Sequence, residues 1–259
     1  MSEDAQLLVS LDRRVLTCTF NRPAARNAMT WQMYEGLYEA CETADERADV
    51  MVLRGSGDKA FIAGTDIAQF EDFTSGQDGV DYEARITRVV NRLEAVNVPT
   101  IAAVHGFCVG GGLAIAAACD LRIATEEARF GVPIARTLGN CLSSNTMSLL
   151  LFHLGPARTL DMLLRARLLS GADAHGAGFV SELVEPDGLD DAVAELVETL
   201  RGHAPLTMWA TKELTRRARR QLVVEDDDVV ARVFGSDDFA GAVRAFGNKT
   251  KPQWGAERP

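Results

Sequence analysis

Hydrophobic residues in the first half of the chain recur with two different spacings, which separate predicted strands from predicted helices. Short apolar runs that end at glycine or proline are typical of buried strands. Longer stretches carry apolar residues three and four positions apart, as Met33, Leu37 and Cys41 do after the potential N-cap Thr30. Strands are therefore expected at residues 7–10, 15–20, 50–53, 61–62, 100–104 and 121–124, and helices at residues 30–47, 80–96 and 113–119.

Helical spacing dominates the second half of the chain, where only residues 180–184 are expected to form a strand. Strands that alternate with helices predict an α/β core. We therefore expect an α/β fold, with a core over residues 1–200 and a helical region over residues 201–259. Helices of this half are expected at residues 142–154, 156–164, 172–177, 189–200, 205–221 and 226–234.

Two polar segments carry expectations of their own. Residues 66–79 are acidic and contain glycine and serine, which is typical of a mobile loop or lid. Residues 216–220 contain four arginines within a predicted helix, and we expect them to form a solvent-exposed face.

Charge and cysteine content narrow the range of partners and compartments. The 259 residues carry a formal net charge of −10, which argues against a nucleic acid or an anionic membrane as partner. The apolar stretch at residues 101–118 contains His105 and four glycines, which argues against a membrane span. Five cysteines without a CxxC pair favour a reducing compartment, so we expect a cytoplasmic protein. No cluster of potential ligands has metal-binding spacing, and no metal is expected.

Two glycine-bearing turns are the strongest candidates for chemistry. One follows the predicted strand at residues 61–62 and contains Gly64 and Thr65, and the other spans residues 106–112 and opens a predicted helix. Glycines at a helix start allow close backbone approach to a ligand and leave N–H groups unpaired. One donor from each turn can converge on one oxygen and stabilise a developing oxyanion. Neither turn matches a P-loop or the G-x-G-x-x-G dinucleotide motif.

Motifs along nearly the whole chain occur in the order that is found in one known family. They include Asn21-Arg22-Pro23, residues 60–67, His105-Gly106, Gly110-Gly111-Gly112, Cys119-Asp120-Leu121-Arg122, Phe130-Gly131 with Pro133, Gly155-Pro156-Ala157-Arg158 and Leu169-Ser170-Gly171. Together these motifs resemble the enoyl-CoA hydratase/isomerase (crotonase) superfamily. The resemblance implies a crotonase-like spiral of ββα turns followed by a C-terminal helical trimerisation region. It also implies a homotrimer or a dimer of trimers.

The resemblance further implies which residues bind the substrate. The N–H groups of Thr65 and Gly111 would hold the carbonyl oxygen of an acyl-CoA thioester. Arg26 would be a candidate partner for a CoA phosphate. No cofactor is expected beyond coenzyme A, which arrives as part of the substrate. The CoA adenine would lie near backbone groups of Ala63, Asp66 and Ile67.

The chain departs from the family at the residues that normally activate water. Hydratases that resemble it carry one glutamate two residues after the third glycine and another directly after the proline of the Phe-Gly-x-Pro segment. Here these positions hold Ala114 and Ile134, which can neither accept nor give a proton. We expect both residues to line the substrate pocket, together with Gly110, Asn140 and Cys141.

Several residues elsewhere are candidates for the missing proton-transfer group. Glu71 and Asp72 of the predicted lid could swing over the acyl group, although a solvated acidic loop is the simpler interpretation. Cys141 is a potential nucleophile if a helix start lowers its pKa, whereas burial would make it an inert thiol. Ser143 and Asn145 are further polar residues that could face the pocket.

Two functions are compatible with these residues. The first is an acyl-CoA-processing enzyme of the hydratase/isomerase group with an altered acid/base set, which stabilises in the oxyanion hole a thioester enolate formed by deprotonation, decarboxylation or conjugate addition. A decarboxylase or an enzyme with substrate-assisted chemistry needs fewer protein carboxylates and fits the two replacements better than a hydratase does. The second is a CoA-thioester-binding protein with little or no hydratase activity, which the loss of both glutamates supports. A serine peptidase on a related fold is disfavoured because the chain has no Gly-x-Ser-x-Gly motif.

Overall fold

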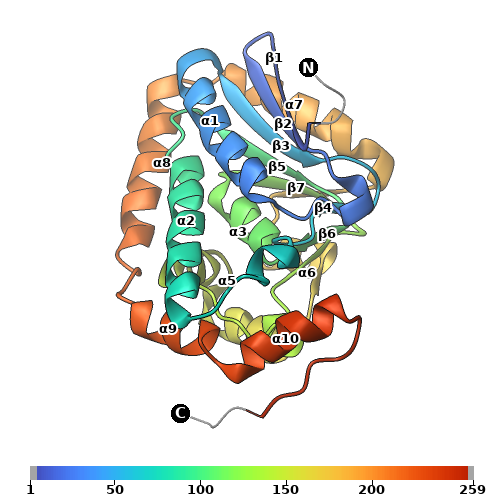
Figure 1. Ribbon diagram of the computed structural model, residues 1–259. Helices are drawn as coiled ribbons and strands as arrows, with labels where there is room; N and C mark the ends of the chain where they lie inside the picture. The colour runs from blue at the N-terminus through green and yellow to red at the C-terminus, as the bar shows by residue number, and fades with distance from the viewer. Residues whose placement is uncertain (1–4, 256–259) are drawn as a thin grey trace.

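Two sheets form the centre of the computed structural model, which describes residues 5–255 (Figure 1). The larger sheet has the order β1-β2-β3-β5-β7-β10, in which only β1 and β2 are antiparallel neighbours. The smaller sheet has the order β4-β6-β8-β9, with β8 and β9 antiparallel. The strands are β1 (Leu7–Asp12), β2 (Val15–Phe20), β3 (Val50–Gly55), β4 (Ala60–Ile62), β5 (Thr100–Val104), β6 (Phe107–Val109), β7 (Leu121–Thr125), β8 (Arg129–Gly131), β9 (Leu169–Ser170) and β10 (Glu182–Val184).

Helices cover both faces of the larger sheet, because its central strands are apolar on both sides. Val52 and Ile101 pack against α7, whereas Leu53 and Ala102 join the main core with α1, α2 and α3. The helices are η1 (Pro23–Ala25), α1 (Trp31–Arg47), η2 (Ile67–Phe70), α2 (Gly76–Glu94), α3 (Gly111–Ala118), α4 (Ile134–Thr137), α5 (Ser144–Leu164), α6 (Gly171–Gly176), η3 (Pro186–Gly188), α7 (Leu189–Arg201), α8 (Pro205–Arg220), α9 (Asp227–Phe234) and α10 (Asp237–Gly247).

Local capping explains where the two long N-terminal helices begin. The hydroxyl of Thr30 accepts a hydrogen bond from the N–H of Met33 at 3.3 Å, so the N-cap predicted for α1 is confirmed. Helix α2 begins earlier than predicted, at Gly76, where the carboxylate of Asp78 accepts a hydrogen bond from the N–H of Ser75 at 2.8 Å. The last four residues of the predicted lid therefore belong to a helix.

The helical second half differs from the prediction in how two helices are connected and in four elements that the sequence pattern did not reveal. The two helices expected around residue 155 form one element, α5, with a kink at Gly155, whose φ is 72°. The strands β8 and β9, the short helix α4 and the helix α10 were not predicted. Segments as short as β8, β9 and α4 carry too little periodicity to be recognised without their tertiary partners. This reason does not apply to α10, which has 11 residues.

Helices α9 and α10 fold back onto the N-terminal core through aromatic side chains. The rings of Phe234 and Phe239 lie 6.5 and 5.8 Å from that of Phe70, which ends η2. Phe234 also lies 5.9 Å from Tyr82 of α2. The boundary expected after residue 200 stays a prediction, and residues 1–4 and 256–259 of the two ranges lie outside the described residues.

No helix within residues 5–255 is both long and apolar enough to cross a lipid bilayer.

Candidate active site

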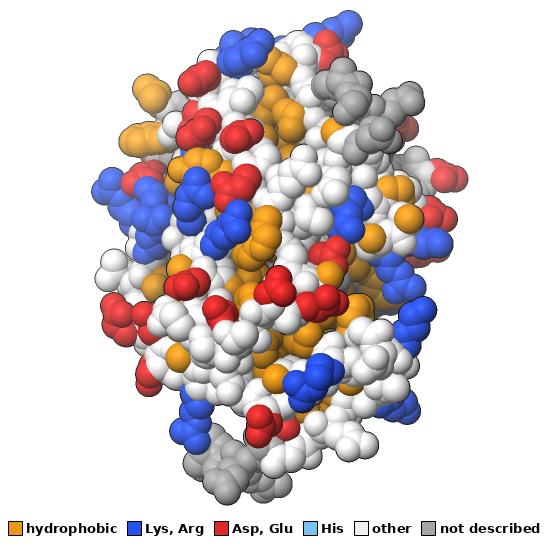
Figure 2. All heavy atoms as spheres, viewed as in Figure 1, with side chains coloured by type: hydrophobic (Ala, Val, Ile, Leu, Met, Phe, Trp, Pro, Cys, Tyr) orange, Lys and Arg blue, Asp and Glu red, His pale blue; other side chains and the backbone are white. Residues whose placement is uncertain are grey.

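A cavity of about 430 Å³ lies where the two glycine-bearing turns meet α2. Its walls are mainly hydrophobic, and Figure 2 shows hydrophobic side chains in a hollow on this face of the molecule. Ile86 of α2, Leu142 before α5 and Phe246 of α10 all contribute to the lining. An apolar chain can be buried here, while the polar groups of the turns orient the ligand.

The two turns place backbone N–H groups side by side at this cavity. Gly64 (φ 110°) and Gly110 (φ 57°) have backbone conformations that favour glycine. The N–H of Gly110 donates to the carbonyl of Gly131, and the carbonyl of Gly64 accepts from Met29, each at 2.9 Å. No described residue accepts a hydrogen bond from the N–H of Thr65 or of Gly111.

The two turns also touch each other. A β-carbon built on Gly111 would lie 3.9 Å from the backbone nitrogen of Thr65 and 2.6 Å from the hydroxyl of Tyr34. The first distance shows that Gly111 lies against the residue that carries the other unpaired N–H group. The second shows that Gly111 has no room for a side chain while Tyr34 keeps its position.

Two tyrosines fix the side chain of Thr65. Its hydroxyl is hydrogen-bonded to Tyr34 of α1 at 2.9 Å and to Tyr82 of α2 at 2.8 Å. Burial raises the pKa of both phenols above their usual value, so both hydroxyls stay protonated and neutral. This arrangement ties the turn after β4 to two helices and holds the N–H of Thr65 in place.

One carboxylate, that of Glu83, lies in the wall of the cavity. Glu83 is on the buried face of α2 and is only 7% exposed. Its Oε2 accepts a hydrogen bond from the backbone N–H of Ser143 at 3.1 Å. Burial, helped by the negative charge of Asp226, raises the pKa of Glu83 to about 7 against the lowering effect of its hydrogen bonds from Ser143.

Comparison with known proteins assigns the chain to a family. The family model described as "Enoyl-CoA hydratase/isomerase" matches residues 11–257. The chain belongs to this family. This result confirms the family expected from the motifs and the interpretation of the chain as an enzyme.

Individual relatives agree in both sequence and fold. "Probable enoyl-CoA hydratase echA8" of Mycobacterium bovis is 31% identical over 254 residues, which is 96% of this chain and 97% of that protein. "Delta(3,5)-Delta(2,4)-dienoyl-CoA isomerase, peroxisomal" of Arabidopsis thaliana is 30% identical over 94% of this chain and 93% of its own length. The crystal structure of an enoyl-CoA hydratase/carnithine racemase from Magnetospirillum magneticum has a TM-score of 0.79 and 32% identity, covering 98% and 96% of the two chains. The predicted crotonase-like α/β fold is confirmed.

Ala114 and Ile134 both line the cavity of this family member. Ala114 lies on α3 one turn after Gly111, and Ile134 begins α4 directly after Pro133. At these two positions the wall carries only hydrocarbon. The expected loss of proton-transfer groups therefore concerns residues that face the cavity.

The two carboxylates of the predicted lid lie outside the cavity lining. Glu71 and Asp72 are exposed and do not line the cavity, so neither is placed to move a proton there. Phe70 is buried among aromatic side chains, which anchors the segment that follows Thr65. Mobility of this segment stays a prediction, and the exposure of both carboxylates agrees with a solvated acidic loop. The sequence pattern does not reveal the aromatic partners of Phe70. These partners are Phe73, Tyr82, Phe234 and Phe239.

The four polar residues after α4 separate into different environments. Asn140 lines the cavity, and its Oδ1 is buried without a hydrogen-bond partner among the described residues. Cys141 packs against the core, and burial raises the pKa of its thiol to about 12, which argues against a nucleophile. Ser143 contributes its N–H to Glu83, whereas Asn145 points away from the cavity toward Arg219.

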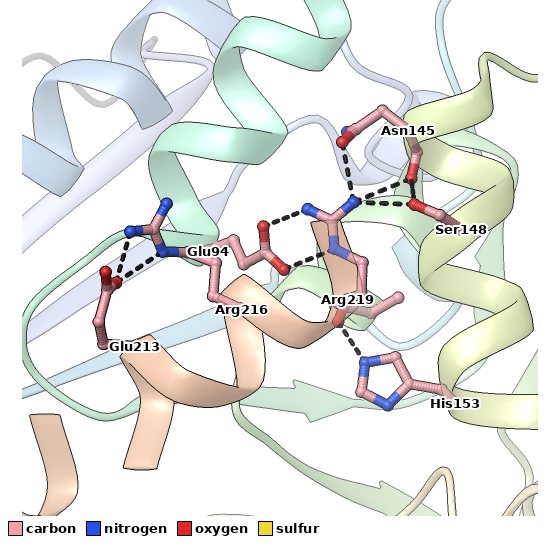
Figure 3. A network of polar contacts seen from close by, with 8 residues as sticks. Glu94, Asn145, Ser148, His153, Glu213, Arg216 and Arg219 are labelled. Carbon is pink, nitrogen blue, oxygen red and sulfur yellow. Dashed lines mark hydrogen bonds and ion pairs between the residues drawn. The ribbon is translucent and has the colours of Figure 1, made fainter. Parts of the chain in front are cut away.

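Arg219 corrects the expectation that residues 216–220 form a solvent-exposed face. Its side chain is 1% exposed and lies between α2 and α5 (Figure 3). It pairs with the carboxylate of Glu94 and donates to Asn145 Oδ1 at 2.9 Å and to the Ser148 hydroxyl at 2.8 Å. Arg219 is therefore a buried link between three helices.

The residues expected around coenzyme A lie at or beside the same cavity. Arg26, Ala63 and Ile67 line it, and the guanidinium of Arg26 lies 5.4 Å from the ring centre of Phe107. Asp66 does not line it, and its carboxylate pairs with Arg22 at 2.9 Å while capping η2. The N–H groups of Ala63 and Asp66 already donate to backbone carbonyls. The carbonyl of Ala63 is left as a potential acceptor, whereas that of Asp66 already accepts from the backbone N–H and the side chain of Gln69.

Within the part of the chain that the structure describes, no group of three or more His, Cys, Asp or Glu side chains is arranged to hold a metal ion.

Sequence reasoning missed Glu83 as a functional candidate, although the pattern of apolar residues in α2 marks it. It lies on the same helical stripe as Ile86, Val90 and Leu93, three, seven and ten residues further on. A glutamate in an apolar stripe is buried or lies at the edge of a cavity, and either position shifts the pKa of its carboxyl group.

Proposed function

We propose that this enzyme binds an acyl-CoA thioester with its carbonyl oxygen between the N–H groups of Thr65 and Gly111. The proposal rests on one observation, which is that both N–H groups lack acceptors and lie side by side at the apolar cavity. Two donors fixed at this point stabilise the negative charge that develops when the thioester becomes an enolate. The start of α3 adds the positive end of a helix dipole.

This binding mode also predicts where the acyl chain and the CoA part of the substrate lie. The acyl chain would pass the hydrocarbon side chains of Ala114, Ile134 and Leu142. The CoA part would leave past Arg26, whose positive charge would face a phosphate, with the adenine near the backbone of Ala63, Asp66 and Ile67. The names of the relatives, which include enoyl-CoA hydratases and a dienoyl-CoA isomerase, support an acyl-CoA as substrate.

Hydration by a pair of glutamates is disfavoured for this chain. That chemistry needs one group to activate water and another to protonate the α-carbon. Ala114 and Ile134 supply neither group, so we expect slow hydration of crotonyl-CoA. The alternative of a CoA-ester-binding protein without turnover is less well supported, because the curated relatives named above are enzymes.

The experiment compares two variants in one background, one of which lacks an oxyanion donor. Gly111→Pro deletes the N–H, and proline is tolerated at the first position of a helix. Because any side chain at residue 111 would collide with Tyr34, both Gly111→Pro and its control Gly111→Ala are made in a Tyr34→Phe background. Each protein is incubated with 2-enoyl-, 3-enoyl-, 3-hydroxyacyl- and malonyl-type CoA esters, and the products are followed by mass spectrometry.

The expected result is turnover of at least one ester, with kcat about 10²–10³-fold lower in the proline variant than in the alanine control. Equal turnover by the two variants would contradict the oxyanion hole. Tight binding of CoA esters without turnover by the wild type would favour the binding protein instead.

We also propose that the protein is cytoplasmic and forms a homotrimer or a dimer of trimers. Large apolar side chains are exposed on the C-terminal helices, and a monomer would leave them in water. Sedimentation velocity tests the assembly, and a monomer at micromolar concentration would contradict it. The exposed residues include Leu160 and Leu164 of α5 and Leu206 and Leu214 of α8.

A further inference from the structure

Among the described residues, Glu83 is the only acidic residue that lines the cavity. It comes from α2, which forms the wall beside Tyr82 and Ile86, and not from the segments that carry Ala114 and Ile134. The cavity therefore contains one group that can accept and return a proton, and it is supplied by a different element of the fold.

The surroundings of Glu83 leave its carboxylate available for chemistry. No Lys, Arg or His among the described residues forms an ion pair with it, and its described hydrogen bonds come from the backbone N–H and the side chain of Ser143. Such a carboxylate is desolvated and basic, and its pKa of about 7 lets it take up and release a proton near neutrality. The other titratable or charged groups around it are Tyr34, Tyr82, Cys141 and Asp226, and Arg26 lines the same cavity.

We propose that Glu83 is the catalytic acid/base of this enzyme, and that it moves the double bond of an enoyl-CoA between C3 and C2. The proposal rests on the binding mode above, in which Thr65 and Gly111 hold the thioester oxygen. It assigns the proton transfer to a residue of α2. The reaction that it predicts is an isomerisation in which water takes no part.

The steps balance without any co-reactant. The Glu83 carboxylate takes a proton from C2 of a 3-enoyl-CoA, and the electron pair of the C–H bond moves toward the thioester oxygen to give a dienolate. The N–H groups of Thr65 and Gly111 stabilise that oxygen. When the carbonyl re-forms, the C2–C3 double bond forms, and the C3–C4 electrons take the proton back from Glu83 at C4.

A single carboxylate is sufficient for this reaction, because the proton removed from one carbon is returned to another. Addition of water would also require a bound water molecule that is oriented toward C3. The hydrocarbon of Ala114 and Ile134 offers no hydrogen bond to such a molecule. At these two positions the lining therefore gives no support to hydration, whereas migration of the double bond needs none.

The test compares Glu83→Gln with Asp81→Asn, which removes a charge from the exposed face of the same helix. Each protein receives 3-hexenoyl-CoA, and the conjugated product is followed by its ultraviolet absorption and by mass spectrometry. We expect the wild type and Asp81→Asn to form an isomer of unchanged mass. Glu83→Gln should do so about 10²–10⁴-fold more slowly, while its affinity for saturated hexanoyl-CoA stays unchanged.

The pH dependence gives a second readout that a structural role would not move. In the wild type, kcat/KM should rise with an apparent pKa of about 7 as Glu83 loses its proton. This limb should be absent from the residual activity of Glu83→Gln.

Three results would overturn the inference, and they differ from a failure of the binding mode. Undiminished isomerisation by Glu83→Gln would exclude Glu83 as the acid/base, while loss of turnover in the Gly111→Pro variant would still support the oxyanion hole. A product heavier by one water would overturn isomerisation. No release or exchange of the C2 proton in D₂O by a wild type that binds hexanoyl-CoA would exclude enolate chemistry altogether.

Discussion

Replacing Glu83 by glutamine should make the folded protein more stable at neutral and alkaline pH. The pKa of Glu83 is about 7 in the folded state, against 4.5 for an ordinary glutamate. The folded state therefore holds the proton more tightly than the unfolded state. As the pH rises from about 4.5 to about 7, the free energy of unfolding falls by about 3 kcal/mol at this residue. Glutamine does not ionise and avoids this loss, so the variant should gain about 3 kcal/mol near pH 8.

Urea unfolding of the two proteins at equal concentration, near pH 5 and near pH 8, measures the effect. The advantage of Glu83→Gln should be mostly absent near pH 5, where the carboxyl is largely protonated in the folded state. Glu94→Gln, on the same helix, is a control that should change the free energy of unfolding in the opposite direction. It leaves Arg219 buried without its carboxylate and should destabilise the protein by about 3–5 kcal/mol. Equal or lower stability of Glu83→Gln near pH 8 would refute the reasoning.

Three further variants test the surroundings of the cavity by steady-state kinetics. Tyr82→Phe removes one hydrogen bond from the Thr65 hydroxyl, worth about 1 kcal/mol, and should lower kcat about fivefold; an unchanged kcat would show that the bond does not position the turn. Arg26→Ala should raise KM about 10–100-fold with little change in kcat, because a charged contact made equally in ground and transition states is lost; a fall in kcat alone would contradict a phosphate contact. Asp226→Asn removes a charge that raises the pKa of Glu83, so the rising limb of kcat/KM should move to lower pH; a shift to higher pH would contradict this assignment.

The elements that sequence reasoning predicted well are those whose signals are local. Thr30 and the spacing of Met33, Leu37 and Cys41 define α1 without help from the rest of the chain. The buried strand β5 likewise follows from an uninterrupted apolar run after a proline. The glycine turns were also found from local composition, since conformations such as that of Gly110 favour this residue.

The features that were missed depend on partners far along the chain. Arg219 resembles the arginines beside it, and its burial follows from Glu94, which lies 125 residues away in sequence. Glu83 carries a visible signal in the apolar stripe of α2, but the stripe does not tell whether it faces packed core or a cavity. That distinction depends on α3 and on the N–H of Ser143, which only the folded chain brings to it.

The aromatic cluster around Phe70 and Tyr82 has a consequence for how the enzyme matures during synthesis. Phe234 and Phe239 leave the ribosome after the side chains on which they pack, which are made more than 150 residues earlier. Until they emerge, the Phe70 anchor and one face of Tyr82 stay uncovered on the nascent protein. Because Tyr82 holds Thr65, a nascent chain that still lacks α9 and α10 should be folded in its sheets yet inactive, with an exposed aromatic surface that chaperones can bind. Activity should therefore appear only when α9 and α10 reach the core.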